Sequence, residues 1–138
     1  MIVIIAGSRT IDTYSVVETA IKESGFTITE ILSGGARGVD LLGEEYARGN
    51  GIKINRKVPD WSKGRGAGYA RNAEMVRSAD ALIAVWDGVS RGTVHTINCA
   101  KEKGIPIYIV RCVKMNDWHH ITARKHIPGL PPAVTEGV

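Results

Sequence analysis

One segment of the chain, Ser33–Asp40, packs three glycines and an arginine into eight residues. Gly34, Gly35 and Gly38 allow a tight turn and bring backbone N–H groups close to a ligand. A helix expected directly after the segment presents unpaired N–H groups and the positive end of its dipole. Arg37 adds a forked cation that suits the same anion. We therefore expect a phosphate-binding loop here.

Two further loops carry similar residue types. Gly7, Ser8 and Arg9 follow the apolar run of residues 2–6, and a second glycine-rich loop follows the apolar run of residues 81–86. This second loop contains Asp87, Gly88, Ser90, Gly92 and Thr93. The hydroxyl groups of Ser8, Ser90 and Thr93 can form hydrogen bonds with phosphate or sugar oxygens. Three such loops make a more specific signal than one.

A longer basic loop, residues 60–66, contains Trp61, and Arg71 and Asn72 lie in the helix expected behind it. The arginine and the asparagine are suited to phosphate or sugar, and the indole ring is suited to stacking on a base. Trp61 also has a simpler interpretation as a packing residue.

The elements that must position these loops alternate between strand and helix. Apolar runs predict strands over residues 2–6, 28–33, 52–58, 81–86 and 106–110, and helical spacing predicts helices after the first four of them. This order predicts an α/β, Rossmann-like doubly wound sheet of about five mainly parallel strands with helices on both faces. Ligands of such sheets bind beyond the carboxyl ends of the strands, where all of these loops would lie.

Bulk properties are compatible with one globular domain of 138 residues. We assign residues 1–110 to a nucleotide-binding domain and residues 111–138 to a short irregular appendage of it. The net charge of +4 favours anionic partners mildly, and it is too small to require a nucleic-acid polymer. Cys99 and Cys112 suggest no disulfide framework. Without a signal-peptide pattern or a membrane-spanning apolar run, a cytoplasmic protein without membrane contact is expected.

Several residues have structural alternatives that the sequence leaves open. Asp40 suits the dipole of its helix or the capping of loop amides, and Asp87 suits an Asx turn. His95 falls one turn into the last predicted helix and is expected to be solvated or hydrogen-bonded. The other histidines have no recognisable metal-ligand spacing, so neither a metal nor a cofactor is predicted.

Taken together, the ordered motifs resemble those of the SLOG superfamily, the Rossmann-like group that unites Smf/DprA and LOG proteins. The chain looks most like its small YspA-type branch, found in bacteria and phages. The resemblance covers about residues 1–110. It rests on the three glycine loops, on Pro59-x-Trp61, and on Ala67-Gly68-x-x-Arg71-Asn72-x-x-Met75. The segment Ser33–Asp40 is also close to the loop of DprA-type proteins, which bind single-stranded DNA.

The comparison with LOG enzymes, which are phosphoribohydrolases, depends on two positions. Arg71 matches the arginine of their Arg-Lys-x-x-Met segment, whereas Asn72 replaces the lysine. Thr96 occupies the position of their catalytic glutamate. A threonine cannot stabilise an oxocarbenium ion or act as general base as a carboxylate does. The resemblance therefore implies phosphate binding without the family's catalytic carboxylate.

We derive three hypotheses. The first is a module that binds a nucleotide or nucleotide-derived ligand as a sensor, carrier or sequestering protein, with no catalytic residue. The second is a nucleoside-phosphate N-glycosidase or related transferase that uses Arg71 with Asp87, or with Asp40 or Glu44, as the carboxylate. The third is single-stranded DNA binding as in DprA, against which the modest charge counts. The resemblance also allows a homo-oligomer.

Overall fold

The apolar run at the N-terminus becomes β1 (Ile2–Gly7), the middle strand of the parallel part of the sheet in the computed structural model, which describes residues 1–129 and 133–134. Successive side chains of a strand point to opposite faces. Val3 and Ile5 enter one hydrophobic core, and Ile4 and Ala6 enter the other. The absence of polar residues in this run therefore reflects burial on both faces of the sheet.

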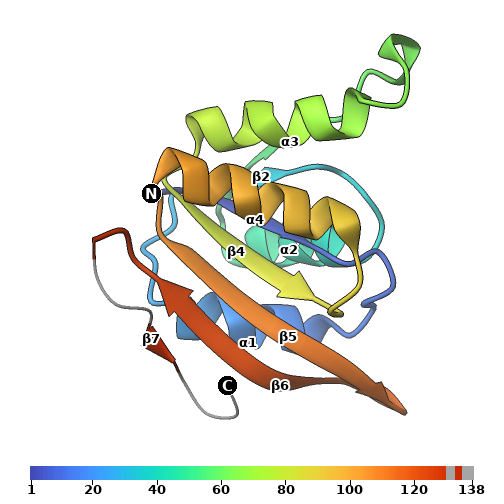
Figure 1. Cartoon of the computed structure of the whole chain (residues 1–138). Helices are drawn as coiled ribbons and strands as arrows, with labels where there is room; N and C mark the ends of the chain where they lie inside the picture. Colours follow the sequence, from blue (N-terminus) through green and yellow to red (C-terminus); the bar gives the residue numbers. More distant parts are fainter. Residues whose placement is uncertain (130–132, 135–138) are drawn as a thin grey trace.

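Within the described residues, twelve elements follow one another (Figure 1). They are β1 (Ile2–Gly7), α1 (Tyr14–Ser24), β2 (Glu30–Ser33), α2 (Val39–Gly49), β3 (Lys53–Arg56), the short 3-10 helix η1 (Trp61–Lys63), α3 (Ala67–Ser78), β4 (Ala81–Trp86), α4 (Arg91–Lys103), β5 (Ile107–Met115), β6 (Asp117–His126) and β7 (Ala133–Val134). Across residues 1–129 and 133–134, every helix is too short or too polar to cross a membrane.

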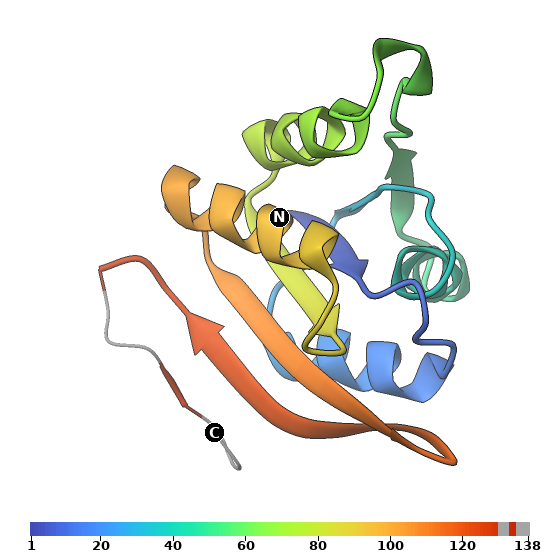
Figure 2. The same ribbon diagram turned by 45° about the vertical axis from the view of Figure 1, so that its right-hand side comes forward.

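The strands form one sheet in the order β3-β2-β1-β4-β5-β6-β7. Neighbouring strands from β3 through β5 are parallel, and β6 and β7 are added antiparallel. One face of the sheet is covered by α1 and α2, and the other by α3 and α4 (Figures 1 and 2). This arrangement confirms the predicted Rossmann-like α/β fold. The strand order reverses between β1 and β4, where such sheets bind ligands.

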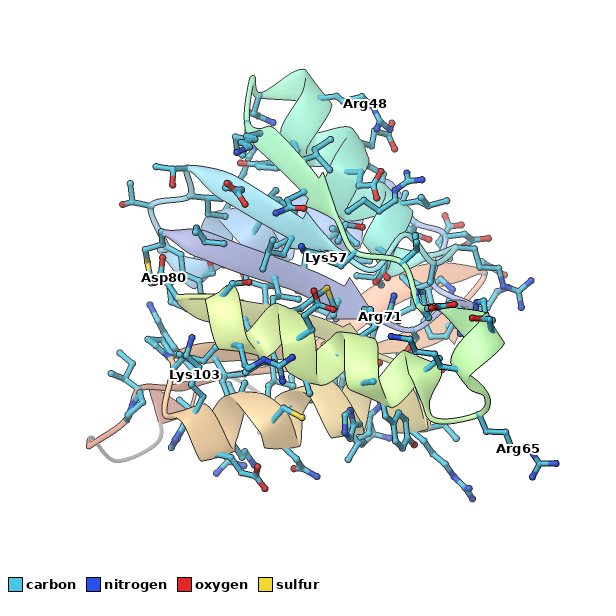
Figure 3. The ribbon with its side chains drawn as sticks, turned by 90° about the horizontal axis from the view of Figure 1, so that it is seen from above. Arg48, Lys57, Arg65, Arg71, Asp80 and Lys103 are labelled. Carbon is cyan, nitrogen blue, oxygen red and sulfur yellow. The ribbon has the colours of Figure 1, made fainter. Side chains whose placement is uncertain are left out.

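The two helices on the second face are joined by a lysine. Lys103, at the end of α4, donates from Nζ to the carbonyl oxygens of Val76, Arg77 and Ala79 over 2.8–2.9 Å. These carbonyls belong to the last turn and the C-cap of α3, where the carbonyl groups of a helix lack intrahelical partners; Val76 O also accepts from the Ala79 N–H. Lys103 thus caps α3 from the neighbouring helix (Figure 3).

In place of the irregular tail predicted after residue 110, residues up to 126 form an antiparallel hairpin. β5 continues to Met115, and Asn116 makes the turn to β6 with a φ of 63°. Trp118, on β6, is buried and its indole nitrogen donates to the carbonyl oxygen of Thr10. The hairpin therefore packs against α1 and widens the sheet (Figure 2). The proline-rich end of the predicted tail lies partly outside the described residues.

Both cysteines are free thiols, as predicted. Cys112 is buried within β5, and burial raises its pKa to about 11. Cys99 lies half-buried on α4.

Candidate functional site

A polar cleft opens at the carboxyl ends of the central strands, and we call it the inner cleft. It lies where the strand order reverses, between the loops after β1 and β2 and the helices α3 and α4. Its lining consists of Ala6, Gly7, Arg9, Ala36, Asp40, Arg71, Asn72, Met75, Ser90, Gly92, Thr93 and Thr96. Residues from all three predicted glycine loops thus meet in one place.

A second, wider cavity adjoins it, and we call it the outer cleft. It encloses about 460 Å³, which is large enough for a small-molecule ligand. Its lining consists of Arg9, Gly34, Gly35, Ala36, Arg37, Val58, Pro59, Trp61 and Arg71. Arg9, Ala36 and Arg71 border both clefts, so a single ligand can extend from one into the other.

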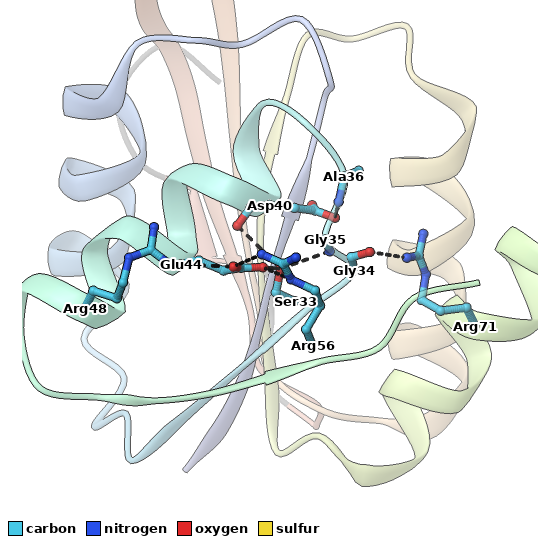
Figure 4. Close-up of polar contacts among 9 residues, drawn as sticks. All are labelled: Ser33, Gly34, Gly35, Ala36, Asp40, Glu44, Arg48, Arg56 and Arg71. Carbon is cyan, nitrogen blue, oxygen red and sulfur yellow. Dashed lines mark hydrogen bonds and ion pairs between the residues drawn. The ribbon is translucent and has the colours of Figure 1, made fainter. Parts of the chain in front are cut away.

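The loop after β2 is held by its own side chains (Figure 4). The Gly35 N–H donates to Ser33 Oγ over 3.1 Å, and the Ala36 N–H donates to Asp40 Oδ2 over 3.2 Å. Position 34 requires glycine, because a Cβ there would overlap the Arg71 guanidinium and the Asp40 carboxylate. This glycine allows the two charged groups to approach the same point.

Ser33 and Glu44 form a buried network of polar contacts that stabilises the fold behind the loop. Ser33 Oγ donates to Glu44 Oε2 over 2.6 Å, and Arg56 forms a two-pronged ion pair with the same carboxylate. Burial opposes ionisation of Glu44, but these hydrogen bonds outweigh it and lower its pKa. Arg48 adds a weaker ion pair at 3.8 Å. Glu44 is therefore a paired structural carboxylate rather than a residue of the inner cleft.

Asp40 lies one helical turn from Glu44, but its environment shifts the carboxyl pKa in the opposite direction. Its side chain is only 6% exposed, yet it borders the inner cleft. Burial raises its pKa to about 6, against smaller lowering effects of the Ala36 N–H and of Arg71. With this pKa the carboxyl group is half-ionised near pH 6 and mostly ionised at pH 7, and pKa values perturbed in this way are common in functional sites.

Arg71 is fixed between the loops that follow β2 and β3. Its Nη1 donates to the carbonyl oxygens of Gly34 (2.7 Å) and Lys57 (3.2 Å), and its Nε donates to Asn72 Oδ1 (2.9 Å). Figure 3 shows it reaching from α3 toward the segment that holds Lys57. Burial lowers its pKa, but the nearby carboxylate of Asp40 opposes that change. The guanidinium is held in place before any ligand arrives.

The amino end of α4 supplies the opposite wall of the inner cleft. Ser90 is its N-cap, and Gly92 and Thr93 of the first turn line the cleft. Thr93 Oγ1 donates to Ser90 Oγ, and Thr96 Oγ1 donates to the Gly92 carbonyl. No acidic residue occupies this first turn, whereas the first turn of α2 contains Asp40. An anion is therefore better stabilised at the end of α4 than at the end of α2.

Some predicted site residues hold the loops together instead of bordering the two clefts. They are Ser8, Ser33, Gly38, Asp87 and Gly88. Asp87 accepts from the N–H groups of Val89 and Ser90, which forms the Asx turn expected as its structural role. Burial opposes its ionisation, but these two backbone bonds outweigh it and lower its pKa. Ser8 Oγ accepts from the Asp87 N–H over 2.9 Å and so joins two loops.

The rim of the outer cleft is aromatic and exposed. Trp61 lies on η1 with 61% of its surface exposed, so it is not a core residue. Close by, the rings of Tyr69 and His95 stack with centroids 4.1 Å apart, and His95 Nδ1 lies 3.4 Å from Asn72 Nδ2. The predicted histidine is thus hydrogen-bonded beside the inner cleft. Sequence reasoning did not assign Ala36, Met75 or Val58 to the site, because small and apolar lining residues have no chemical signature; Met75 stood out only as part of a motif that resembles the SLOG superfamily.

Comparison with known proteins gives one family. A search of curated proteins found no match to the chain. The family model described as "YAcAr: YspA, cpYpsA-related SLOG family" matches residues 1–64, which include β1, β2 and the loops after them. This match supports membership of the SLOG superfamily, in its YspA-type branch.

Proposed function

We propose that the protein binds a nucleotide or a nucleotide-derived ligand, with its anionic group in the inner cleft and its base in the outer cleft. The family match points in general to a module that binds or processes a nucleotide-related ligand. The proposal places this function in residues 1–110, which include every residue that borders the two clefts. Residues 111–126 continue the sheet of that domain as the rest of β5 and as β6, and none of them borders either cleft.

The anionic end is supported by charges on two sides of the inner cleft. Arg9 comes from the loop after β1 and Arg71 from α3, and the amino end of α4 adds Gly92 and Thr93 to the same lining. Free N–H groups of a helix start and guanidinium donors are the groups that bind phosphate in proteins. This convergence of two arginines and a helix start at the reversal of strand order is the observation that carries the proposal.

The lining of the outer cleft supports the proposed position of the nucleotide base. Pro59, Val58 and the exposed ring of Trp61 give it apolar surface beside the cations Arg9 and Arg37. A flat base can stack on an indole ring, and stacking is worth about 1–3 kcal/mol per base. A binding protein of this kind would act as a sensor, carrier or sequestering module for its ligand.

The proposal is tested by calorimetric titration with nucleoside 5′-monophosphates and 5′-diphosphates. The Arg9→Gln variant should bind roughly ten- to hundred-fold more weakly, because a charge-assisted hydrogen bond contributes about 1.5–3 kcal/mol. Arg65→Gln is the matched control, since Arg65 points away from the protein and borders neither cleft (Figure 3). Thermal unfolding of both variants checks that the fold is intact.

Two results would overturn this proposal. One is a wild-type protein that binds none of the nucleotides. The other is an equal loss of affinity in Arg9→Gln and Arg65→Gln, which would mean that net charge rather than the cleft attracts the ligand.

A second candidate function, hydrolysis of the N-glycosidic bond, is favoured by one observation. Asp40 borders the inner cleft together with Thr96, which stands where LOG enzymes have glutamate. A carboxyl group with a pKa of about 6 is suited to general acid–base catalysis near neutral pH. In this reaction water adds to the anomeric carbon, the bond to the base breaks, and the base leaves with a proton. Chromatography for free base after incubation with nucleoside monophosphates tests it, and Asp40→Asn should abolish any release.

A further inference from the structure

Asp40 has one oxygen whose hydrogen bond is known and one that is open. Oδ2 accepts from the Ala36 N–H, and no residue in the described part of the chain donates to Oδ1. Among the described residues, no side-chain oxygen is both fully enclosed and without a partner. Since Oδ1 is therefore not fully enclosed and Asp40 borders the inner cleft, we take this cleft as the side from which a donor reaches Oδ1.

Nearby cations do not pair with this carboxylate. Arg9 and Arg71 are close enough to influence it, but neither forms an ion pair with it in the described structure. Arg71 already donates to two carbonyl oxygens and to Asn72. Asp40 is therefore not held in the cleft as the counter-ion of an arginine.

The neighbouring carboxylate on α2 shows what a purely structural role looks like. Glu44 is as deeply buried as Asp40, and both of its oxygens have partners from Arg56 and Ser33. Stabilisation of the helix dipole by Asp40 would not require burial either, since exposed carboxylates do the same. The open acceptor atom in the cleft needs another explanation.

We propose that Asp40 Oδ1 accepts a hydrogen bond from a hydroxyl group of the ligand, and that it makes the site selective for ribonucleotides over their deoxy counterparts. This inference rests on the proposed nucleotide-binding function. An ionised carboxylate is an acceptor and repels phosphate oxygens. The phosphate therefore lies toward α4 and the arginines, and a sugar hydroxyl lies toward Asp40.

Selectivity for the ribonucleotide follows from the free-energy cost of leaving a buried carboxylate oxygen without a hydrogen-bond donor. A ligand without the hydroxyl displaces water from the inner cleft and leaves the buried carboxylate without a donor. Sites built to hydrogen-bond a substrate hydroxyl reject analogues that lack it for this reason. We expect the deoxy analogue to bind roughly ten- to hundred-fold more weakly than the ribonucleotide.

The experiment compares ribonucleoside 5′-diphosphates with their 2′-deoxy and 3′-deoxy analogues by calorimetric titration at pH 8. Wild-type protein should prefer the ribonucleotide to at least one deoxy analogue. Asp40→Asn keeps an oxygen for the Ala36 N–H and turns an NH₂ group toward the cleft. This variant should lose the preference while still binding the deoxy analogue. Glu45→Gln removes an exposed carboxylate from the same helix, and it should retain the wild-type preference.

The outcomes separate this inference from the function on which it rests. Equal affinity of the wild-type protein for ribo and both deoxy forms overturns the inference and leaves nucleotide binding intact. A preference that survives in Asp40→Asn overturns it as well, and so does loss of all binding in a folded Asp40→Asn variant. If no nucleotide binds to the wild-type protein, the proposed function fails and the inference fails with it.

Discussion

Replacing Asp40 with asparagine should make the protein more stable at alkaline pH. The folded state raises the pKa of this carboxyl group from 3.8 to about 6, because the side chain is buried. A group whose pKa is higher in the folded state stabilises the fold when it is protonated. This contribution to the free energy of unfolding is lost as the pH rises through the folded-state pKa. Above about pH 6 the wild-type protein therefore keeps an unfavourable buried charge that the amide lacks.

The size of the effect follows from the two pKa values. A difference between 3.8 and about 6, at about 1.36 kcal/mol per factor of ten in proton affinity, corresponds to about 3 kcal/mol. The asparagine must also be buried with its NH₂ group facing the cleft, so the expected gain at pH 8 is about 1–3 kcal/mol. The gain should shrink between pH 6 and pH 4 and be close to zero at pH 4.

Urea unfolding of wild type and Asp40→Asn at several pH values between 4 and 8 measures this difference directly. Asp87→Asn is a control of opposite sign, because Asp87 has a lowered pKa and its ionised form stabilises the fold at neutral pH. A variant at position 40 that is less stable than wild type at pH 8 would refute the reasoning. So would a difference between the two proteins that does not change with pH.

Three further outcomes are expected. Glu44→Gln should lower the free energy of unfolding at pH 7 by about 1–3 kcal/mol, because Arg56 loses its buried partner; an unchanged urea midpoint would contradict this. Lys103→Met should cost about 1–2 kcal/mol and speed amide exchange at the end of α3, since the carbonyl oxygens there lose the hydrogen bonds from the lysine Nζ; unchanged exchange would show that water replaces the lysine. Arg37→Ala should weaken nucleotide binding in calorimetry while thermal stability stays within about 0.5 kcal/mol, and equal losses of both would make the arginine structural.

The sheet was predictable because its central strands are continuous apolar runs separated by helical spacing. The hairpin was missed because polar residues such as Lys114 and His119 interrupt the pattern, and its outer face is not covered by a helix. Asn116 is the residue that could have indicated the hairpin turn, since asparagine tolerates the positive φ of a tight turn between two strands.

The edge of the sheet that carries the candidate site was also predictable, whereas the roles of single residues there were not. Asp40 and Asp87 both lie in glycine-containing segments after strands, and each had a structural alternative beside a role in the site. In the structure Asp87 Oδ1 accepts from two N–H groups of its own loop and Oδ2 accepts from the Thr10 hydroxyl, whereas Asp40 keeps an oxygen for the cleft. That difference depends on which backbone amides lie within reach, which is decided by how the loops pack.

The way Ser8 joins the loops has a consequence for how the protein would adapt to ligands. Its carbonyl accepts from the Val39 N–H and its hydroxyl from the Asp87 N–H, so the floor of the inner cleft is cross-linked. η1 has no buried residue and projects from the body of the protein (Figures 1 and 2). Binding would then order the wall around Trp61 and leave the floor unchanged. We expect strict discrimination at the sugar and phosphate and greater tolerance for the identity of the base.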